Sequence, residues 1–259
     1  MISHLPQALV QTGKMGMSTF TFKRFSINQD QCAMKVSTDA CVFGAWATKK
    51  IVEYELPFAQ ILDIGTGTGL LSLMAAQQLP NCLIDAIEID ELASLQARDN
   101  FSSSPWSDRI NSIHIDVKLY ESIEEYDVIL SNPPFFEGAL PANSEAKNKA
   151  FHDSCLTLRE LLSVSHKLLK GEGRLFLLLP IGRKNDLINF CNLEGFFITT
   201  CCSVKSSPVK EISRILVECK KKEVCHEHTT LNTALIIQGD FKGYSSETFQ
   251  LLKEYYLYL

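Results

Sequence analysis

The stretch Ile61-Leu62-Asp63-Ile64-Gly65-Thr66-Gly67-Thr68-Gly69 is followed directly by the apolar run 70–76. A short apolar strand thus leads into a turn with glycine at every second position, and the turn opens a helix. Because glycine has no Cβ, such a turn can adopt positive φ and its backbone can pass very close to a ligand. The pattern predicts a strand-turn-helix unit of an α/β sheet, with a nucleoside lying across the end of the strand.

Two common phosphate-binding turns fit this stretch poorly. A dinucleotide fingerprint would need glycine at position 70, where the sequence has Leu70, and a P-loop would need Gly-Lys-Ser or Gly-Lys-Thr, which is absent. A turn that merely lets a helix pack closely rarely calls for three alternating glycines just after an acidic residue. Both pyrophosphate-binding interpretations are therefore weakened.

Two further apolar segments also end in acids. The segment 84–90 carries Glu88 at its end, and the segment 110–115 is followed by Asp116. An acid at such a strand end is well placed to accept hydrogen bonds from ribose hydroxyls, as in dinucleotide-binding folds, and Asp116 could accept from the exocyclic amine of an adenine. Glu88 alone would be read more simply as a solvated carboxylate. Three successive strand ends closed by glycine or acid favour a shared ligand crevice.

The segment 126–131 is a fourth apolar strand, and it runs into the turn Asn132-Pro133-Pro134-Phe135. The two prolines fix consecutive φ angles and donate no N–H, so the turn is stiff and presents acceptors. The Asn132 side-chain oxygen and the Pro133 carbonyl could both accept from one NH₂ group, while Phe135 offers a flat face to an adjacent ring. Although Asn-Pro is a common turn starter and phenylalanine is more often core, the neighbouring strand ends favour a site for an aromatic amine.

With these motifs the chain resembles a class I S-adenosylmethionine-dependent methyltransferase, and its Asn-Pro-Pro-Phe turn resembles that of the amino-methylating branch. Within that branch it is similar to the bacterial tRNA1(Val) (adenine(37)-N6)-methyltransferases over nearly the whole chain from Phe20. The glycine-rich and Asn-Pro-Pro-Phe elements specify only the superfamily. The family is specified by further segments, namely 22–25, 30–39, 44–47 and 104–110, and the match extends to 251–257.

The resemblance implies methyl transfer from S-adenosylmethionine to the N6 amine of adenosine 37, with tRNA bound through its anticodon loop. The expected catalytic residues are those of the Asn132 to Phe135 turn. No metal is expected. The expected cofactor-binding residues are Asp63, Gly65, Thr66, Gly67 and Gly69 around the methionine, Glu88 on the ribose, Asp116 on the adenine, and Lys35, Thr38 and Asp39 in an additional cofactor-side segment.

Three other functions stay open at this point. The chain could be an amino methyltransferase that acts on another RNA base or on a protein glutamine, since similar turns occur for both substrates. It could be a nicotinamide dehydrogenase, which Leu70 argues against. It could also be a non-catalytic RNA-binding module that binds S-adenosylmethionine only structurally.

Composition agrees with the expectation of a single cytoplasmic enzyme. The chain has 259 residues, 46% of them hydrophobic, enough for one domain over 1–259 with an N-terminal extension (about 1–50) and a C-terminal strand-helix addition (about 230–259). Its nine cysteines are odd in number and scattered, which predicts reduced thiols, and the cluster 225–228 (Cys-His-Glu-His) is expected to be a solvated loop. No signal peptide or membrane span is expected, because the longest apolar run is 175–179. We expect a monomer.

The formal net charge of −5 is unusual for a protein that binds RNA. Local clusters of positive charge would have to contact the phosphates instead. The basic candidates are Lys23, Arg24, Lys147, Lys149, Arg183, Lys184, Lys205, Lys210 and Arg214. Of these, the lysines in the loop 136–150 directly follow the turn Asn132 to Phe135, which we call the acceptor turn.

The order of the patterns predicts a Rossmann-like open, mostly parallel sheet with helices on both faces and one antiparallel strand near the C-terminal edge. The antiparallel pair follows because residues 206–208 leave no room for a helix between the last two main strands. We also expect an edge strand over 20–27, a helix over 40–48 capped by Thr38 and Asp39, a strand over 233–237 and a terminal helix over 246–257. The main strands are expected at 59–64, 82–88, 110–115, 126–131, 173–180, 196–203 and 212–219, and the helices between them at 69–79, 90–101, 153–169 and 182–193.

Overall fold

A computed structural model describes residues 19–56, 58–134, 156–224, 229–241 and 243–259 of the chain. The strands are β1 (Thr19–Thr21), β2 (Ser26–Asn28), β3 (Gln60–Ile64), β4 (Leu83–Glu88), β5 (Ile110–His114), β6 (Tyr126–Ser131), β7 (Leu169–Pro180), β8 (Phe196–Lys205), β9 (Ile212–Lys221) and β10 (Leu231–Ile236). The helices are α1 (Thr38–Glu53), α2 (Leu70–Gln78), α3 (Glu91–Ser102), α5 (Leu158–Leu168), α6 (Lys184–Leu193) and α7 (Ser246–Leu252), with the 3₁₀ turns η1 (Val117–Leu119), η2 (Ile181–Arg183) and η3 (Lys222–Val224).

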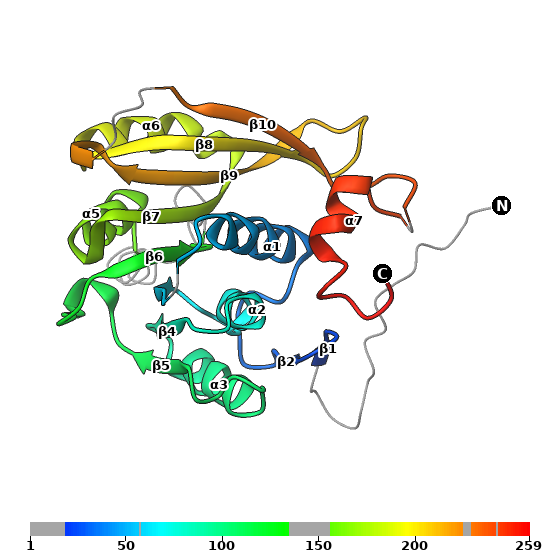
Figure 1. Ribbon diagram of the computed structural model, residues 1–259, viewed down its shortest axis with the longest axis horizontal. Helices are drawn as coiled ribbons and strands as arrows, with labels where there is room; N and C mark the ends of the chain where they lie inside the picture. Colours follow the sequence, from blue (N-terminus) through cyan, green and yellow to red (C-terminus); the bar gives the residue numbers. More distant parts are fainter. Residues whose placement is uncertain (1–18, 57, 135–155, 225–228, 242) are drawn as a thin grey trace, which may run out of the picture.

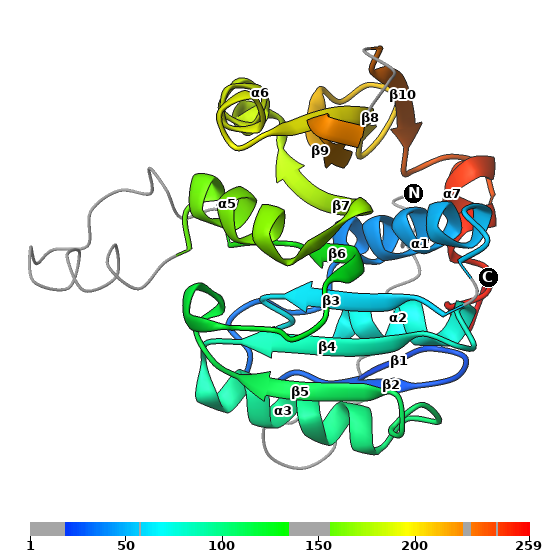
Figure 2. The ribbon, with the colours of Figure 1, turned by 60° about the vertical axis from the view of Figure 1, so that its left-hand side comes forward.

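Eight strands form one sheet in the order β10-β8-β9-β7-β6-β3-β4-β5. Neighbouring strands are parallel except that β9 runs antiparallel to both β7 and β8. The arrowheads of β3, β4 and β5 therefore meet at one edge of the sheet (Figure 2), which we call the carboxyl edge. The predicted fold class, including the single reversed strand, is confirmed.

Helices cover both faces of this sheet, as Figure 1 shows. One apolar cluster joins α1, α2, α3 and α7 to one face, and a second joins α5 and α6 to the other. Helix α2 is buried on nearly all sides, because the sheet, α1 and the C-terminal segment all pack against it. Helix α5 has one apolar face and begins with a capping box made by Thr157 and Glu160. The sheet is thereby buried on both sides.

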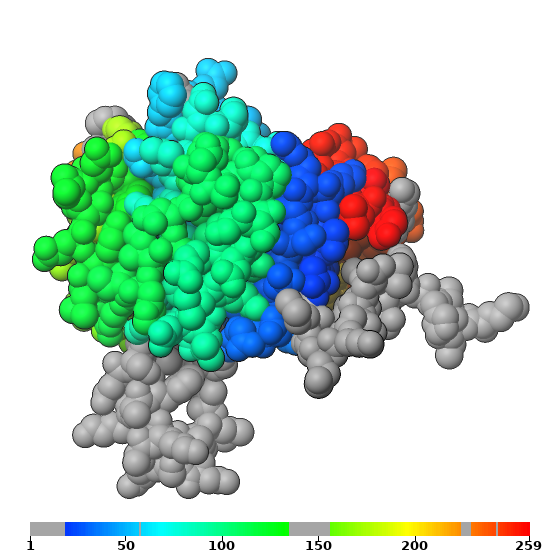
Figure 3. All heavy atoms as spheres, turned by 90° about the horizontal axis from the view of Figure 1, so that it is seen from below, coloured from blue at the N-terminus to red at the C-terminus, as the bar shows by residue number. Residues whose placement is uncertain are grey.

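The expected edge strand over 20–27 is wrong. The chain reverses in a tight turn where the Phe22 N–H donates to the Phe25 carbonyl, so β1 and β2 form a separate antiparallel pair. The Lys23 N–H donates to the Tyr255 carbonyl at 2.7 Å, which ties this pair to the C-terminal segment. In Figure 3 the blue N-terminal segment accordingly lies against the red C-terminal one. Alternating apolar residues indicate a strand but do not say with which strand it pairs.

Several helix ends differ from expectation. Helix α1 is capped by Ser37, whose Oγ accepts from the Ala40 N–H, so Thr38 and Asp39 are its first residues rather than its cap, and the helix continues to Glu53 instead of 48. The terminal helix ends at Leu252 rather than at 257. Beyond Leu252, Tyr255 is buried in the core of the α1 face and Tyr256 packs against it. The start of the helix expected over 153–169 falls partly outside the described residues.

A buried carboxylate lies between β9 and α1. Glu218 is 2% exposed and accepts hydrogen bonds from the Tyr54 hydroxyl at 2.6 Å, from Thr200 Oγ1 at 3.0 Å and from Arg174 Nη1 at 2.6 Å. Lys50 Nζ lies 3.3 Å away, and the Arg174 guanidinium lies 3.6 Å from the centre of the Tyr54 ring. Burial alone would raise the pKa of Glu218, but the Tyr54 hydrogen bond and the charges of Lys50 and Arg174 outweigh burial and lower it.

We expect the substitution Glu218→Ala to lower the free energy of unfolding by about 3 kcal/mol or more, because it leaves the mostly buried Arg174 without its carboxylate. The matched control is Glu172→Ala in the adjacent strand, where the carboxylate pairs with Lys220 but is 74% exposed. For that variant a loss below about 1 kcal/mol is expected. Urea denaturation of both variants measures the difference in the free energy of unfolding. Equal losses would contradict a larger stabilising role for the buried Glu218 carboxylate.

Candidate functional site

The register of the parallel strands brings the three central strand ends into one row. The residues paired across this row are Ser131, Ile64 and Ile87. The next residue along each chain is Asn132 after β6, Gly65 after β3 and Glu88 at the end of β4. Because neighbouring strands lie about 4.8 Å apart, these three positions are side by side at the carboxyl edge.

The three glycines of the turn after β3 have positive φ, at 72° for Gly65, 55° for Gly67 and 84° for Gly69. A Cβ built on Gly65 or Gly67 would meet no atom within 4 Å, so the space over these two residues is open. A Cβ on Gly69 would lie 2.4 Å from the Phe101 ring. The first two glycines therefore keep a ligand-sized approach to the backbone clear, and the third lets α3 pack against the turn.

Asp63 lies beneath this turn and is fully buried. Its Oδ2 accepts hydrogen bonds from the hydroxyls of Thr66 and Ser72, each at 2.7 Å. Its Oδ1 is buried and has no hydrogen-bond partner among the described residues. Burial raises the pKa of Asp63 to about 6, although the Ser72 and Thr66 hydrogen bonds lower it in part. A buried carboxylate with one unpaired oxygen fits a site that takes a cationic ligand.

The Glu88 carboxylate is fixed by the backbone around it. Its Oε2 accepts from the Gly67 N–H at 2.9 Å, and its Oε1 accepts from the N–H groups of Ile89 and Asp90 at 2.9 and 3.0 Å. The side chain is only partly buried. Since a carboxylate can accept about four hydrogen bonds, Glu88 keeps capacity for a ligand hydroxyl in a fixed orientation.

Asp116 lies beyond the end of β5, the strand next to β4. Its Oδ1 accepts from the Lys118 N–H at 2.9 Å and thereby caps the turn η1, and Lys118 Nζ lies 3.7 Å from its Oδ2. The carboxylate is 26% exposed. Asp116 is thus near Glu88 along the sheet edge, with one oxygen used for capping and the other close to a lysine.

The acceptor turn is anchored to the glycine-rich turn. Ser131 Oγ donates to the Ile64 carbonyl at 2.8 Å, which joins the last residue of β6 to the last residue of β3. After Ser131, Asn132 is partly buried, Pro133 is buried and Pro134 is exposed. Phe135, predicted to be a stacking platform, lies outside the described residues, as do Lys147 and Lys149.

The N-terminal segment between β2 and α1 passes along the same edge. The Asn28 N–H donates to Asn100 Oδ1, and Asn100 Nδ2 donates to both the Asn28 and Thr68 carbonyls, all at 2.9 Å. Further along this segment, Cys32 lies close enough to Glu88 for the carboxylate charge to add to burial, and together they raise the pKa of the thiol to about 11. One asparagine on α3 thus holds the segment and the glycine-rich turn together.

The three predicted cofactor-side residues of this segment have different surroundings. Lys35 is exposed, and Thr38 is the first residue of α1. Asp39 Oδ2 lies 3.4 Å from Arg214 Nε, so its carboxylate faces the start of β9. The structure therefore brings Asp63, the glycines, Glu88, Asp116 and Asn132 to one edge. Asp39 instead faces Arg214 of β9, further along that edge.

Sequence reasoning missed three residues that shape the site: Ser72, Asn100 and Ser131. Ser72 could have been noticed, because it is the lone polar residue in the apolar run 70–76. Ser131 closes an apolar strand directly before Asn132, which is a weaker signal. Asn100 carries no local signal, since its partners are far away in the sequence.

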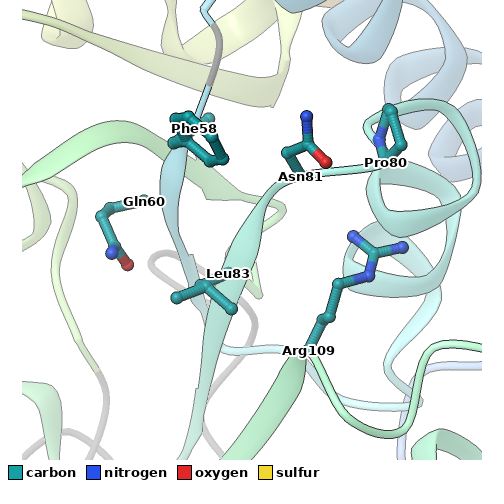
Figure 4. Close-up of a pocket in the computed structure, with 7 residues that line it drawn as sticks. Phe58, Gln60, Pro80, Asn81, Leu83 and Arg109 are labelled. Carbon is teal, nitrogen blue, oxygen red and sulfur yellow. The ribbon is translucent and has the colours of Figure 1, made fainter.

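A hollow of about 250 Å³ lies at the opposite edge, where β3, β4 and β5 begin, and is lined by Phe58, Leu83 and Arg109 among others (Figure 4). The Arg109 guanidinium there donates to the carbonyls of Ala76, Leu79 and Cys82, so it closes the end of α2 and is not directed to a ligand. Within the described ranges, no cluster of His, Cys, Asp or Glu is arranged to hold a metal ion, and seven cysteines are free. The cluster 225–228 is outside those ranges.

Among the described helices, none is long and apolar enough to span a membrane. The family model of the methyltransferase small domain matches residues 47–180, just over half of the chain. A crystal structure from Listeria monocytogenes, described as a class I S-adenosylmethionine-dependent methyltransferase, superposes with a TM-score of 0.61 at 15% identity, covering 86% of this chain and 73% of that one. At this identity the likeness shows the fold alone.

Two curated relatives are similar over almost their whole length. A tRNA1(Val) (adenine(37)-N6)-methyltransferase of Dyadobacter fermentans is 40% identical over 238 residues, covering 92% of this chain and 97% of the relative. A protein of the same name from Pseudoalteromonas translucida is 37% identical over 241 residues, covering 93% and 99%. The chain therefore belongs to the methyltransferase small-domain family and, within it, to the family of the tRNA1(Val) (adenine(37)-N6)-methyltransferases.

Proposed function

We propose that this protein transfers a methyl group from S-adenosylmethionine to the exocyclic N6 amine of adenosine 37 in the anticodon loop of valine tRNA. The observation that carries the proposal is the row formed by Asn132, Gly65 and Glu88 at the carboxyl edge. In this row the acceptor turn lies beside the glycine-rich turn, and Glu88, which we propose binds the ribose, lies one strand further. The target amine and the cofactor could therefore meet at this edge. A tRNA substrate also implies that the protein works in the cytoplasm.

The residues of this edge suit the proposed cofactor. S-adenosylmethionine, when bound, supplies an electrophilic methyl group on a sulfonium that carries positive charge. The open space over Gly65 and Gly67 gives its methionine part access to the backbone, and the buried Asp63 supplies negative charge below. Glu88 is oriented to accept from a ribose hydroxyl, and Asp116 has one oxygen outside the cap of η1 for an adenine amine. The cofactor roles of Lys35, Thr38 and Asp39 stay predictions.

The acceptor turn can make the adenine amine reactive. The lone pair of the N6 nitrogen is delocalised into the ring, so the nitrogen is a poor nucleophile. The Asn132 side-chain oxygen and the Pro133 carbonyl would each accept a hydrogen bond from one N–H of the amine. These two bonds would let the nitrogen become pyramidal and direct its lone pair at the methyl group. These hydrogen bonds strengthen as positive charge develops on the nitrogen, so they favour the transition state over the ground state. No general base is needed before transfer: the bond between the sulfonium sulfur and the methyl carbon would break as the new N–C bond forms, leaving a neutral thioether. The methylated nitrogen, then cationic, would lose one proton to solvent.

The target base must leave its own stack to reach this turn. Pro134 stiffens the turn, and Phe135 would stack on the extruded base and replace roughly 1–3 kcal/mol of lost stacking. An unpaired anticodon-loop base costs little to extract. These roles of Pro134 and Phe135 rest on the sequence and the family.

Incubation of the enzyme with tRNA lacking the modification and with labelled S-adenosylmethionine tests the function directly. Nucleoside analysis is expected to find the label in N6-methyladenosine of valine tRNA. The substitution Asn132→Ala should lower this rate by roughly a hundredfold or more, because one acceptor of the amine is lost, while cofactor binding persists. The matched control, Asn81→Ala at the opposite edge, should be as active as the wild type. Label in peptides or in another nucleoside would show that the substrate is a protein or a different base and would refute the proposed target. An active N132A variant would refute the mechanism.

The substitution Glu88→Gln should weaken S-adenosylmethionine binding by roughly 1.5–3 kcal/mol, about tenfold to more than a hundredfold in Kd, because it removes a charged acceptor from a ribose hydroxyl. Isothermal titration calorimetry measures the change. Glu91→Gln, three residues further along the chain at the first turn of α3, is the control and should bind like the wild type. Unchanged affinity in E88Q would remove Glu88 from the cofactor site.

The affinity for S-adenosylmethionine should rise as the pH increases from 5 to 7. The pKa of Asp63 is about 6 without ligand, so the carboxyl is largely protonated at pH 5, and a nearby cation favours its ionised form. Binding therefore releases a proton below pH 6, and affinity is gained as pH rises through that value. In Asp63→Asn the profile should be flatter over this range. Parallel profiles for the two proteins, measured by calorimetry, would show that Asp63 does not sense the cofactor.

A further inference from the structure

Basic residues are gathered on the part of the carboxyl edge beyond the acceptor turn, where β7, β8 and β9 meet it. Lys184 begins α6 after β7, Lys205 ends β8, Lys210 lies in the loop that joins β8 to β9, and Arg214 lies near the start of β9. That loop projects at the upper right of Figure 1. We call these four residues the basic hairpin edge.

Strand register relates this surface to the acceptor turn. Ser131 of β6 is paired with Leu177 of β7, and Pro180, three residues further along β7, is paired with Arg214 of β9. Leu177 is also paired with Val217 of β9, and two strand spacings of about 4.8 Å separate β6 from β9, so Val217 lies roughly 10 Å across the sheet from Ser131. Arg214 lies three residues nearer the carboxyl edge along β9. The hairpin continues from Arg214 away from the acceptor turn.

The charges of the basic hairpin edge are available to a partner. Among the described residues, Lys184, Lys205 and Lys210 form no ion pair. Arg214 pairs with Asp39 through Nε, and its Nη1 donates to the Ser213 carbonyl at 3.1 Å. Because both side chains of the Arg214–Asp39 pair are about one-third exposed, the pair is weak, and the guanidinium keeps further N–H donors for a phosphate.

The acids of the carboxyl edge are mostly elsewhere. Glu88, Asp90 and Asp116 lie at the ends of β4 and β5, on the side of the acceptor turn away from β9. On the basic side Asp39 is paired with Arg214, Asp186 is paired with Arg183 at 3.2 Å, and Glu211 adjoins Lys210. Asp240 is also on this side, two residues beyond Gln238, whose N–H donates to the Ser206 carbonyl. Glu88, Asp90 and Asp116 thus lie on one side of the Asn132 turn, and Lys184, Lys205 and Lys210, which form no ion pair with a described residue, lie on the other. A polyanion that presents one base to Asn132 would be repelled by the first side and attracted to the second.

We propose that the basic hairpin edge binds the phosphates of the RNA strand that leads to the target base, with Arg214 nearest the active site and Lys205 and Lys210 further out. The identity of the ligand, an RNA of tRNA size, rests on the proposed function. Its charges guide and hold the RNA without reading the sequence, because phosphate contacts position a nucleic acid but carry no base information.

The test compares Lys205→Gln/Lys210→Gln with a matched double variant, Lys49→Gln/Lys167→Gln. Lys49 and Lys167 are exposed residues in the C-terminal parts of α1 and α5, away from the carboxyl edge, and form no ion pair with another described residue. Fluorescence anisotropy measures the Kd for an unmodified valine tRNA transcript at several salt concentrations. Steady-state kinetics gives kcat and KM for the same RNA, and calorimetry gives the Kd for S-adenosylmethionine.

Loss of two phosphate contacts should reduce the slope of log K against log salt by about 1.4 and weaken tRNA binding roughly tenfold or more at 0.1 M salt. KM for tRNA should rise while kcat and cofactor affinity stay at wild-type values, and the control double variant should keep the wild-type slope. An unchanged slope and KM in K205Q/K210Q, with methylation of tRNA intact, would overturn the surface and leave the proposed function standing. Lost RNA binding in that variant, in a protein that never methylates tRNA, would support the surface and refute the function.

Discussion

The parallel register of β6, β3 and β4 is the constraint on which the site depends. Ser131, Ile64 and Ile87 are held in one row by strand pairing, so the residues that follow them cannot be moved independently. The hydrogen bond from Ser131 Oγ to the Ile64 carbonyl fixes the same relation at the point where the chains leave the sheet. A one-residue slip of β6 would turn Asn132 to the other face of the sheet and expose its apolar neighbours to the wrong layer.

The ionised form of Asp63 is costly in this arrangement and useful for the same reason. A carboxylate buried under the glycine-rich turn resists ionisation, and the hydroxyls of Thr66 and Ser72 satisfy only one of its oxygens. A cation bound over the turn would offset the desolvation cost of the Asp63 carboxylate, so the buried charge favours binding of a positively charged cofactor. The N-terminal segment is coupled to this site because Asn100 bonds both to Asn28 and to the turn.

The sheet, its order of motifs and the strand-end residues were predictable because each is encoded within a few neighbouring residues. Alternating glycines, acids after apolar runs and Asn-Pro-Pro all act locally, and parallel strands then bring them together. The contact of Asp39 with Arg214 and the bridging role of Asn100 were not predictable, since each joins residues distant in sequence. The pairing of β1 with β2 is local, but the alternating pattern over 20–27 does not reveal the tight turn that reverses the chain between Phe22 and Phe25. The same limit applied at α1, where Ser37 and Thr38 are both good caps and only the backbone path decides between them.

The negative net charge becomes understandable from how charge is distributed along one edge. Glu88, Asp90 and Asp116 lie beside β4 and β5, where a cationic cofactor suits them, and Lys205, Lys210 and Arg214 lie beside β8 and β9, where a polyanion would lie. Screening at physiological salt limits each charge to a range of about 8 Å, so a distant excess of acid elsewhere on the surface scarcely weakens the basic side. The field that an RNA meets is therefore set by Arg214 and its neighbouring lysines rather than by the sum over the chain. The Asp39–Arg214 pair lies on this basic side, on β9, which is separated from β6 by β7 alone.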